Sequence, residues 1–212
     1  MIHRITRTLA AAALAALAGC AAAVGPTYYL LDPALPAARA DAGAGSGAGA
    51  GSGAGAGSGA GAGAGGRLIG LRELDLPLYA RRQSIAELGA GGAVTLNDND
   101  RWAEEPGRAF TRVLARALAA RLGRDVVVEP WPAGTSPDTL IDVDVDRLIA
   151  RPGGSLTLTG QWRIDRRTGG PDASDSFRFE VPVEPGVPGI VDAHGRALTA
   201  LSEPIADALS TP

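Results

Sequence analysis

The chain has 212 residues, of which 20 are basic and 23 acidic, so its formal net charge at pH 7 is −3. This balance excludes a protein that binds nucleic acid through a strongly basic surface. The single cysteine excludes an intramolecular disulfide. About 150 residues remain outside the export signal and the low-complexity tract described below, which is enough for one domain with a single core.

The first 19 residues have the features of an export signal. Arg4 and Arg7 give it a positive start, and an apolar alanine and leucine core extends from Leu9 to Ala16. That core is too short to span a bilayer as a helix, which takes about 20 apolar residues. Residues 1–19 are therefore predicted to be a signal peptide that is removed. Its removal takes away two arginines and no acid, so the net charge moves from −3 to −5.

The signal ends in Leu17-Ala18-Gly19-Cys20, which resembles the lipobox of bacterial lipoproteins. The resemblance implies that Cys20 is lipidated and becomes the mature N-terminus, with residues 20–26 as a short tether. An ordinary signal peptide cut after Ala16-Leu17-Ala18 is the alternative, but it would leave an unpaired thiol in an oxidising compartment. Ala21, in place of an aspartate, resembles an outer-membrane sorting signal. We therefore expect a lipid-anchored protein on the periplasmic face of the outer membrane.

The folded domain is predicted to span residues 27–212. Its first strand candidate, Thr27 to Leu31, is rich in aromatic and apolar residues, and a tether this short reaches at most about 20 Å. Residues 42–66 consist almost wholly of Gly, Ala and Ser, with a repeated Gly-Ala-Gly-Ala-Gly-Ser hexamer. A silk-like role needs many stacked copies, so we expect a disordered loop insertion. The G-x-G-x-x-G match at 61–66 lacks the strand before it and the helix after it that a dinucleotide site requires.

Three further extended segments precede the first helix. Leu68 to Leu76 ends at a proline, and the β-like pieces Ser84 to Leu88 and Ala93 to Asn97 flank a glycine-rich turn. That arrangement predicts a hairpin. The acidic cluster Asn97 to Asp100 is predicted to be a turn.

The periodicity of Pro106 to Leu122 predicts a helix that stops at Gly123. Its apolar positions are Phe110, Val113, Leu114, Ala117, Leu118 and Leu122. Another side of the helix carries Arg108, Arg112 and Arg116 at steps of four. This basic stripe is expected to face solvent, and binding of an acidic partner or a lipid phosphate is the alternative.

The second half of the chain is predicted to add strands and one more helix. Val126 to Glu129 forms one strand, and the alternating patterns of Leu140 to Ile149, Leu156 to Ile164 and Phe177 to Val183 predict an antiparallel meander. The last helix runs from Ala197 to Leu209, and Pro204 either kinks it or follows a new start capped by Ser202. The fold class is therefore α/β: a single domain with a mixed, largely antiparallel sheet and two main helices packed on one face.

No constellation in the sequence indicates catalysis or a cofactor. Asp142, Asp144 and Asp146 share a strand face, but alternate residues lie about 7 Å apart, so their carboxylates form a row that does not converge on one ion. We expect a solvated face and no metal. His194 is the one histidine of the mature chain, and we expect a surface or capping position for it.

Several motifs follow the lipobox in a fixed order. They are Tyr28-Tyr29-Leu30-Leu31, Leu76-Pro77-Leu78-Tyr79 with Arg82-Gln83-Ser84-Ile85, Arg101-Trp102-Ala103-Glu104 at the start of a helix, Pro130-Trp131, and Gly160-Gln161-Trp162. This ordered set resembles the PqiC-like family of ABC-type transport auxiliary lipoproteins. The resemblance implies a non-catalytic subunit, without cofactor, of an envelope lipid-transport system. Its implied partner is an MCE-domain protein that bridges the periplasm, and self-association into a homo-oligomer is also compatible with it.

Five residues in these motifs are candidates for binding the partner, namely Pro77, Tyr79, Arg82, Arg101 and Trp102. Tyr79 is equally well explained as a lid packed on a turn. Trp102 is better explained as a hydrophobic staple against Phe110 or its neighbours than as an interface anchor.

Two other functions remain as alternatives. One is a stand-alone lipoprotein that holds acyl chains between the sheet and the helices. The other is a periplasmic hydrolase that uses His194, although no serine lies in a G-x-S-x-G motif.

Overall fold

The computed structural model describes residues 25–33 and 67–210. The predicted signal peptide, the lipidation site Cys20, most of the tether and the predicted loop 42–66 lie outside the described residues. The elements within them, in chain order, are β1 (Thr27–Tyr29), β2 (Ile69–Leu71), β3 (Ser84–Leu88), a 3-10 turn η2 (Ala90–Gly92), β4 (Val94–Trp102), α2 (Pro106–Leu122), β5 (Val126–Val128), β6 (Thr139–Ala150), β7 (Ser155–Arg166), β8 (Ala173–Pro182) and α3 (Val187–Ser210).

The described strands form one mixed sheet of eight. On one side, β6 pairs with β7 along its whole length, and β7 pairs with β8, which makes the predicted antiparallel meander. On the other side, the first residues of β6 pair with β2, which pairs with β5, and the last residue of β6 pairs with β3. The predicted β3–β4 hairpin is present, and β1 adds to β4 in parallel. The antiparallel ladders are long and the parallel ones short, which agrees with the predicted mixed, largely antiparallel sheet.

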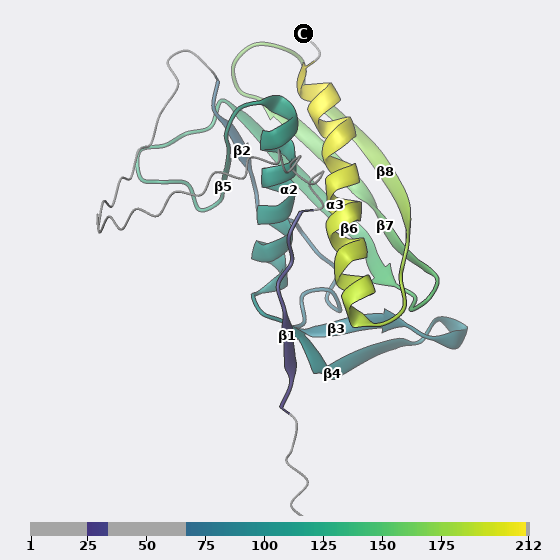
Figure 1. Ribbon diagram of the computed structural model, residues 1–212. Helices are drawn as coiled ribbons and strands as arrows, with labels where there is room; N and C mark the ends of the chain where they lie inside the picture. The colour runs from purple at the N-terminus through teal and green to yellow at the C-terminus, as the bar shows by residue number, and fades with distance from the viewer. Residues whose placement is uncertain (1–24, 34–66, 211–212) are drawn as a thin grey trace, which may run out of the picture.

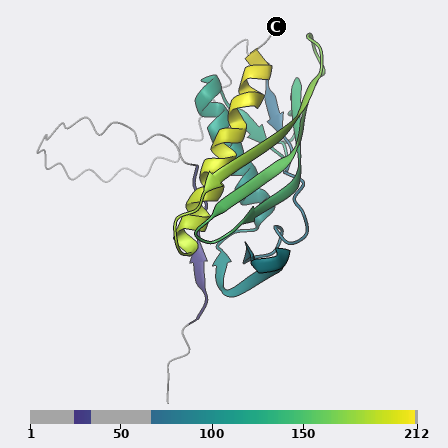
Figure 2. The ribbon, with the colours of Figure 1, turned by 90° about the vertical axis from the view of Figure 1, so that its right-hand side faces the viewer.

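Both helices cover the same face of this sheet, with α2 and α3 side by side in front of the strands (Figures 1 and 2). The predicted α/β class is therefore confirmed. The core between helices and sheet is continuous from β2 to α3, and its largest fully buried side chains include Phe110, Leu114, Ile141, Leu158 and Ile164. No helix in the described part of the chain is both long and apolar enough to cross a membrane.

Helix α2 has the bounds that its periodicity predicts. Phe110, Val113, Leu114 and Leu118 are buried on one side. Gly123 ends the helix with φ 65°, a left-handed conformation that glycine adopts without steric cost, and its N–H donates to Ala119 O. Local sequence signals and tertiary burial agree in this element.

Helix α3 begins ten residues earlier than predicted, at Val187 instead of Ala197. Gly189 and Gly195 lower the helix propensity of this half, but Gly189 is required by packing, because a Cβ there would lie 2.1 Å from Glu184 O. The helix continues through Pro204. The predicted alternative of a cap at Ser202 is wrong, because its hydroxyl donates to Thr199 O at 2.6 Å and accepts from Arg121 Nε on α2 at 2.9 Å.

The predicted turn at Asn97 to Asp100 is also wrong, because β4 continues through these residues to Trp102. Three residues, 98 to 100, have no counterpart on β3, where the register shifts between Ser84 and Ile85. Asp100 then pairs with Thr27 of β1. The turn-like composition therefore marks a β-bulge within a strand, and the segment Arg101-Trp102 closes β4 and does not open the helix.

Candidate functional site

The residues of the Arg101–Glu104 motif lie where β4, α2 and α3 meet. Trp102, at the end of β4, is only 4% exposed. Its ring packs edge-on against Phe110 of α2 and against His194 of α3, with ring centroids 5.4 and 5.2 Å apart. The interpretation of Trp102 as a staple against Phe110 fits this geometry, and the burial of the side chain leaves little of it for a partner to contact.

His194 is buried inside this aromatic cluster, so the prediction of a surface or capping position is wrong. Its Nδ1 lies 2.7 Å from Ile190 O, one turn earlier in α3, which requires the proton on Nδ1. Burial in apolar surroundings lowers the pKa of His194 to about 4, because the imidazolium loses its hydration, and the bond to Ile190 opposes this shift only in part. At neutral pH the ring is uncharged.

A small cavity of about 10 Å³ lies beside His194 and is also lined by Tyr79, Ser84 and Trp102. Pockets that hold small molecules have volumes of roughly 300 Å³ or more. This space is therefore part of the packing of the core and is not a substrate site.

Tyr79 belongs to a turn between β2 and β3, in which the N–H of Ala80 donates to Pro77 O at 2.9 Å. The phenol oxygen of Tyr79 accepts from the N–H of Leu148 at 3.1 Å. That N–H lies just beyond the irregularity at Val145 and Arg147 where the β6–β7 register shifts. Tyr79 thus closes the turn onto β6, which is the role that the lid interpretation assigns to it.

The remaining candidates lie at the surface of the β1–β4–β3 region. Arg82 is exposed and Pro77 is half-buried. Arg101 is half-buried, with its Nε donating to Asp98 O at 3.0 Å. In the sheet register Arg101 lies between Tyr28 of β1 and Ser84 of β3. Trp102 is therefore buried and the half-buried Tyr79 is bonded to β6, whereas Pro77, Arg82 and Arg101 lie where a partner can reach them.

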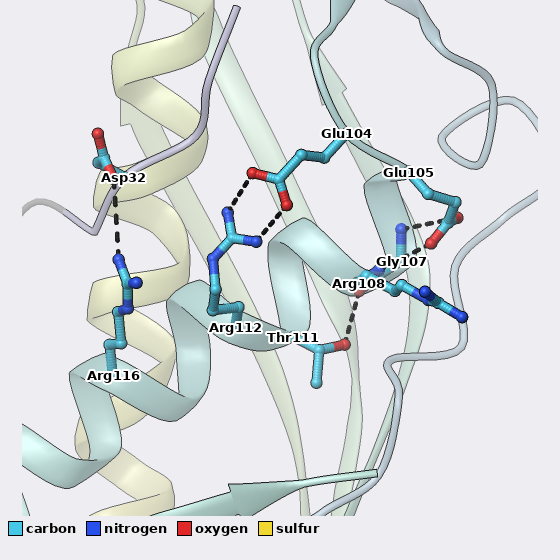
Figure 3. Close-up of polar contacts among 8 residues, drawn as sticks. All are labelled: Asp32, Glu104, Glu105, Gly107, Arg108, Thr111, Arg112 and Arg116. Carbon is cyan, nitrogen blue, oxygen red and sulfur yellow. Dashed lines mark hydrogen bonds and ion pairs between the residues drawn. The ribbon is translucent and has the colours of Figure 1, made fainter. Parts of the chain in front are cut away.

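The first turn of α2 is fixed by two glutamates (Figure 3). Glu105 caps the helix, and its carboxylate accepts from the N–H groups of Gly107 and Arg108 at 3.0 and 2.9 Å. Glu104 forms a bidentate pair with the guanidinium of Arg112, with 2.8 Å between Oε1 and Nη2. The hydrogen bonds from Arg112 lower the pKa of Glu104.

The basic stripe is thus largely matched by acids of the same chain. Beyond the Arg112 pair, Arg116 lies 3.9 Å from Asp32, which follows β1 (Figure 3). Arg108 at the start of the stripe is exposed. The Arg112–Glu104 pair holds the loop before α2 against the helix, and Arg116 lies near the segment after β1, an arrangement that the sequence pattern alone did not reveal.

Sequence reasoning also missed Thr111, which is fully buried on α2. Its hydroxyl donates to Gly107 O at 2.6 Å and accepts from the N–H of Leu74 at 2.9 Å. The hydroxyl therefore links α2 to the irregular segment after β2. A threonine in the middle of a helix gives no local signal for such a contact.

The aspartate row of β6 lies on the sheet face opposite the helices. Asp142 is half-buried and pairs with Arg72 at 3.0 Å, whereas Asp144 and Asp146 are exposed. A polar groove of about 380 Å³ is lined by both Asp142 and Asp144, together with Arg72 and Arg163. In residues 25–33 and 67–210, no group of three or more His, Cys, Asp or Glu side chains is placed to hold a metal ion.

Two comparisons place the chain among known proteins. A family model described as ABC-type transport auxiliary lipoprotein component matches residues 52–206. The matched range begins inside the Gly/Ala/Ser tract, so Cys20 and β1 lie before it. No curated protein matches the chain.

Solved structures show the same fold at low sequence identity. The crystal structure of an uncharacterised protein is 20% identical, with a TM-score of 0.60 over 68% of this chain and 92% of that one. A crystal structure of a protein from Xanthomonas campestris is 14% identical, with a TM-score of 0.51 over 66% of this chain and 81% of that one. Both likenesses concern the fold alone.

Proposed function

Because the chain belongs to the family of ABC-type transport auxiliary lipoproteins, we propose that it is a non-catalytic lipoprotein subunit that docks an envelope lipid transporter containing an MCE-domain protein. The family match carries this proposal, since it extends from the tract before β2 almost to the end of α3. The family description makes the protein an auxiliary component of a transport system. An auxiliary component acts through a partner, so its functional site is a docking surface.

The location that we propose is the periplasmic face of the outer membrane. Support comes from the lipobox at Cys20 and from Ala21 after it. Lipidation at Cys20 would hold the domain on the membrane through the short segment that precedes β1. A transporter that spans the periplasm would then meet the domain at the outer membrane.

We place the docking surface on the β1–β4–β3 region and the turn before β3. Pro77, Arg82 and Arg101 lie there and are accessible, and Tyr28 is 55% exposed beside Arg101. Arginine and tyrosine are frequent anchors of protein interfaces, because they combine a large contact area with hydrogen-bonding groups. The buried Trp102 supports this surface from beneath.

The two alternative functions have less support. Acyl chains held between sheet and helices need an enclosed volume of hundreds of Å³. The cavity beside His194 measures about 10 Å³, and the hollow of about 300 Å³ between α2 and β5, lined by Arg108, Arg112 and Val128, is open to solvent. A hydrolase that uses His194 needs a histidine that substrate can reach, and this one is 4% exposed. Its pKa of about 4 also makes it a weak general base at neutral pH.

The proposal is tested by binding of the purified lipidated protein to an MCE-domain protein from the same bacterium. We expect complex formation with the wild type and at least about tenfold weaker binding for Arg82→Glu combined with Arg101→Glu, since charge reversal opposes an interface that fits arginine. Arg124→Glu is the control for charge reversal, because Arg124 is exposed, as Arg82 is, but follows α2, away from this surface. Failure of the wild type to bind any such protein would overturn the proposal.

A further inference from the structure

The large apolar side chains that are exposed in the described residues are confined to three short segments. Tyr28 and Leu30, in and just after β1, are 55% and 62% exposed, and Leu78 is 71% exposed. Val94 and Leu96, in β4, are 44% and 42% exposed. Single exposed apolar residues need no explanation, but four of these five lie in or next to the paired strands β1 and β4.

The tip of the β3–β4 hairpin is apolar and uncharged. Val94 pairs with Leu88 and Leu96 with Ala86, so these four side chains share one face of the hairpin. From Leu88 to Leu96 the sequence contains no charged residue, and Glu87, opposite Thr95, lies on the other face of the hairpin. A hairpin that projects into water normally carries charges, and this one carries none at its tip.

The hairpin lies at the same end of the molecule as the start of β1. Strand β1 runs parallel to β4, with Thr27 opposite Asp100, so β1 begins beside the bulge of β4 that precedes Arg101. Both views show the start of β1 and the hairpin at one end of the molecule, with the C-terminal end of α3 at the opposite end (Figures 1 and 2). The chain from Cys20 to Gly25 spans at most about 18 Å when fully extended.

We propose that the tip of the β3–β4 hairpin, through Val94 and Leu96, rests in the interfacial layer of the membrane that holds the lipid on Cys20. This inference rests on the proposed lipidation. A tether of this length keeps the tip at a high effective concentration next to the bilayer, and that proximity favours lipid over a freely diffusing protein as the occupant. The contact is a second, weaker attachment that sets how the domain is oriented on the membrane.

Insertion is shallow. The outer edge of β4 from Val94 to Asn99 has no partner strand in the described part of the chain, because pairing with β1 begins at Asp100. Unpaired backbone N–H and C=O groups are strongly disfavoured in hydrocarbon but remain hydrated among headgroups. Tyrosine is also preferred at that depth, and Tyr28 lies on the adjacent strand.

The test uses the full-length lipidated protein in phosphatidylethanolamine and phosphatidylglycerol vesicles. Lipidation consumes the thiol of Cys20, the one cysteine of the chain, so Leu96→Cys and Val94→Cys each provide a single site for an environment-sensitive fluorophore. Thr168→Cys is the control, since it is exposed in the β7–β8 turn, beside the C-terminal end of α3 where Arg166 Nη2 donates to Ala208 O. Thermal unfolding checks that each variant is folded.

Nitroxide lipids labelled near the headgroup are expected to quench the fluorophore at positions 94 and 96 several-fold more than at 168. Equal quenching at all three positions on vesicles that carry the protein would overturn the inference and leave lipidation intact. A cross-link between two copies through position 96, without quenching, would overturn it in favour of self-association. Failure of the protein to float with the vesicles would contradict the proposed lipidation itself.

Discussion

At the scale of single residues, His194 joins the three elements that meet at the end of β4. Its ring contacts Trp102 of β4 and Phe110 of α2, while its Nδ1 donates to the carbonyl of Ile190 within α3. The ring is large and nearly apolar in its neutral form, so it serves as core packing. The same burial makes its protonation unfavourable in the folded state.

The burial of His194 predicts a specific dependence of stability on pH. The pKa is about 4 in the folded protein and 6.5 in the unfolded chain. Below pH 6.5 the unfolded chain binds a proton that the folded protein excludes, so the free energy of unfolding falls as the pH drops from 6.5 toward 4. The loss approaches about 3 kcal/mol at pH 4, from about 1.4 kcal/mol per pKa unit.

Urea denaturation across this pH range measures the effect. The His194→Leu variant is the control, because it keeps an apolar side chain and removes the titrating group. Its stability is expected to vary less with pH between 4 and 6.5 than that of the wild type. If the free energies of unfolding of the two proteins changed with pH in the same way, His194 would not be the cause of the pH dependence.

Thr111 makes a second prediction at the residue scale. Thr111→Val keeps the shape of the side chain but leaves the buried N–H of Leu74 without its acceptor. An unsatisfied buried donor costs about 1–3 kcal/mol, so we expect a decrease of that size in the free energy of unfolding. Thr111→Ser retains the hydroxyl and should recover most of the loss, and denaturant titration of both variants decides the point.

At the scale of elements, the sequence predicted those whose local signals agree with their burial. Helix α2 has a proline at its start, an apolar stripe and a terminal glycine, and its bounds are as predicted. The three long meander strands alternate in sequence, because one face of each is covered by the helices. The period of β6 is interrupted where the β6–β7 register shifts between Val145 and Arg147, and three consecutive residues are buried at each end of the strand.

Other elements depend on contacts that sequence patterns do not contain. The Asn97 to Asp100 cluster resembles a turn, but pairing with β3 and β1 on either side makes it part of a bulged strand. The glycines at 189 and 195 resemble a loop, but close packing requires the first of them inside α3. For the candidate site, the motif pattern identified Tyr79 and Trp102, and only the structure shows that Trp102 is buried and that the half-buried Tyr79 is bonded to β6.

The connection between β1 and β2 gives a prediction about the Gly/Ala/Ser tract. Both strands belong to the same sheet, so residues 34–66 join two parts of one domain. The connection comprises residues 30–68, so deleting residues 42–65 shortens it from 39 to 15 residues. Loop-closure entropy then predicts an increase of about 1 kcal/mol in the free energy of unfolding, with docking unchanged.

Chemical denaturation and the binding assay check this prediction together. Loss of folding on deletion would show that the tract is not a passive loop. Loss of binding in a folded deletion variant would instead give the tract a direct role in docking.

At the scale of the whole molecule, the two ends of the domain differ in chemistry. The end with β1, the β3–β4 hairpin and the turn at Pro77 carries the exposed apolar side chains together with Arg82 and Arg101. The opposite end carries the polar β7–β8 turn and the C-terminal end of α3 (Figure 2). An anchor at Cys20 would hold the first end at the membrane, so the membrane contact and the docking surface that we propose lie next to each other.

Docking of a periplasm-spanning MCE-domain protein is the central claim, and site-specific photocross-linking in intact cells tests it most directly. A photoreactive amino acid at position 82 should form an adduct with the MCE-domain protein, whereas one at the exposed position 178 on the edge strand β8 should not. Adducts from position 82 only with unrelated proteins, or equal adducts from both positions, would contradict the claim.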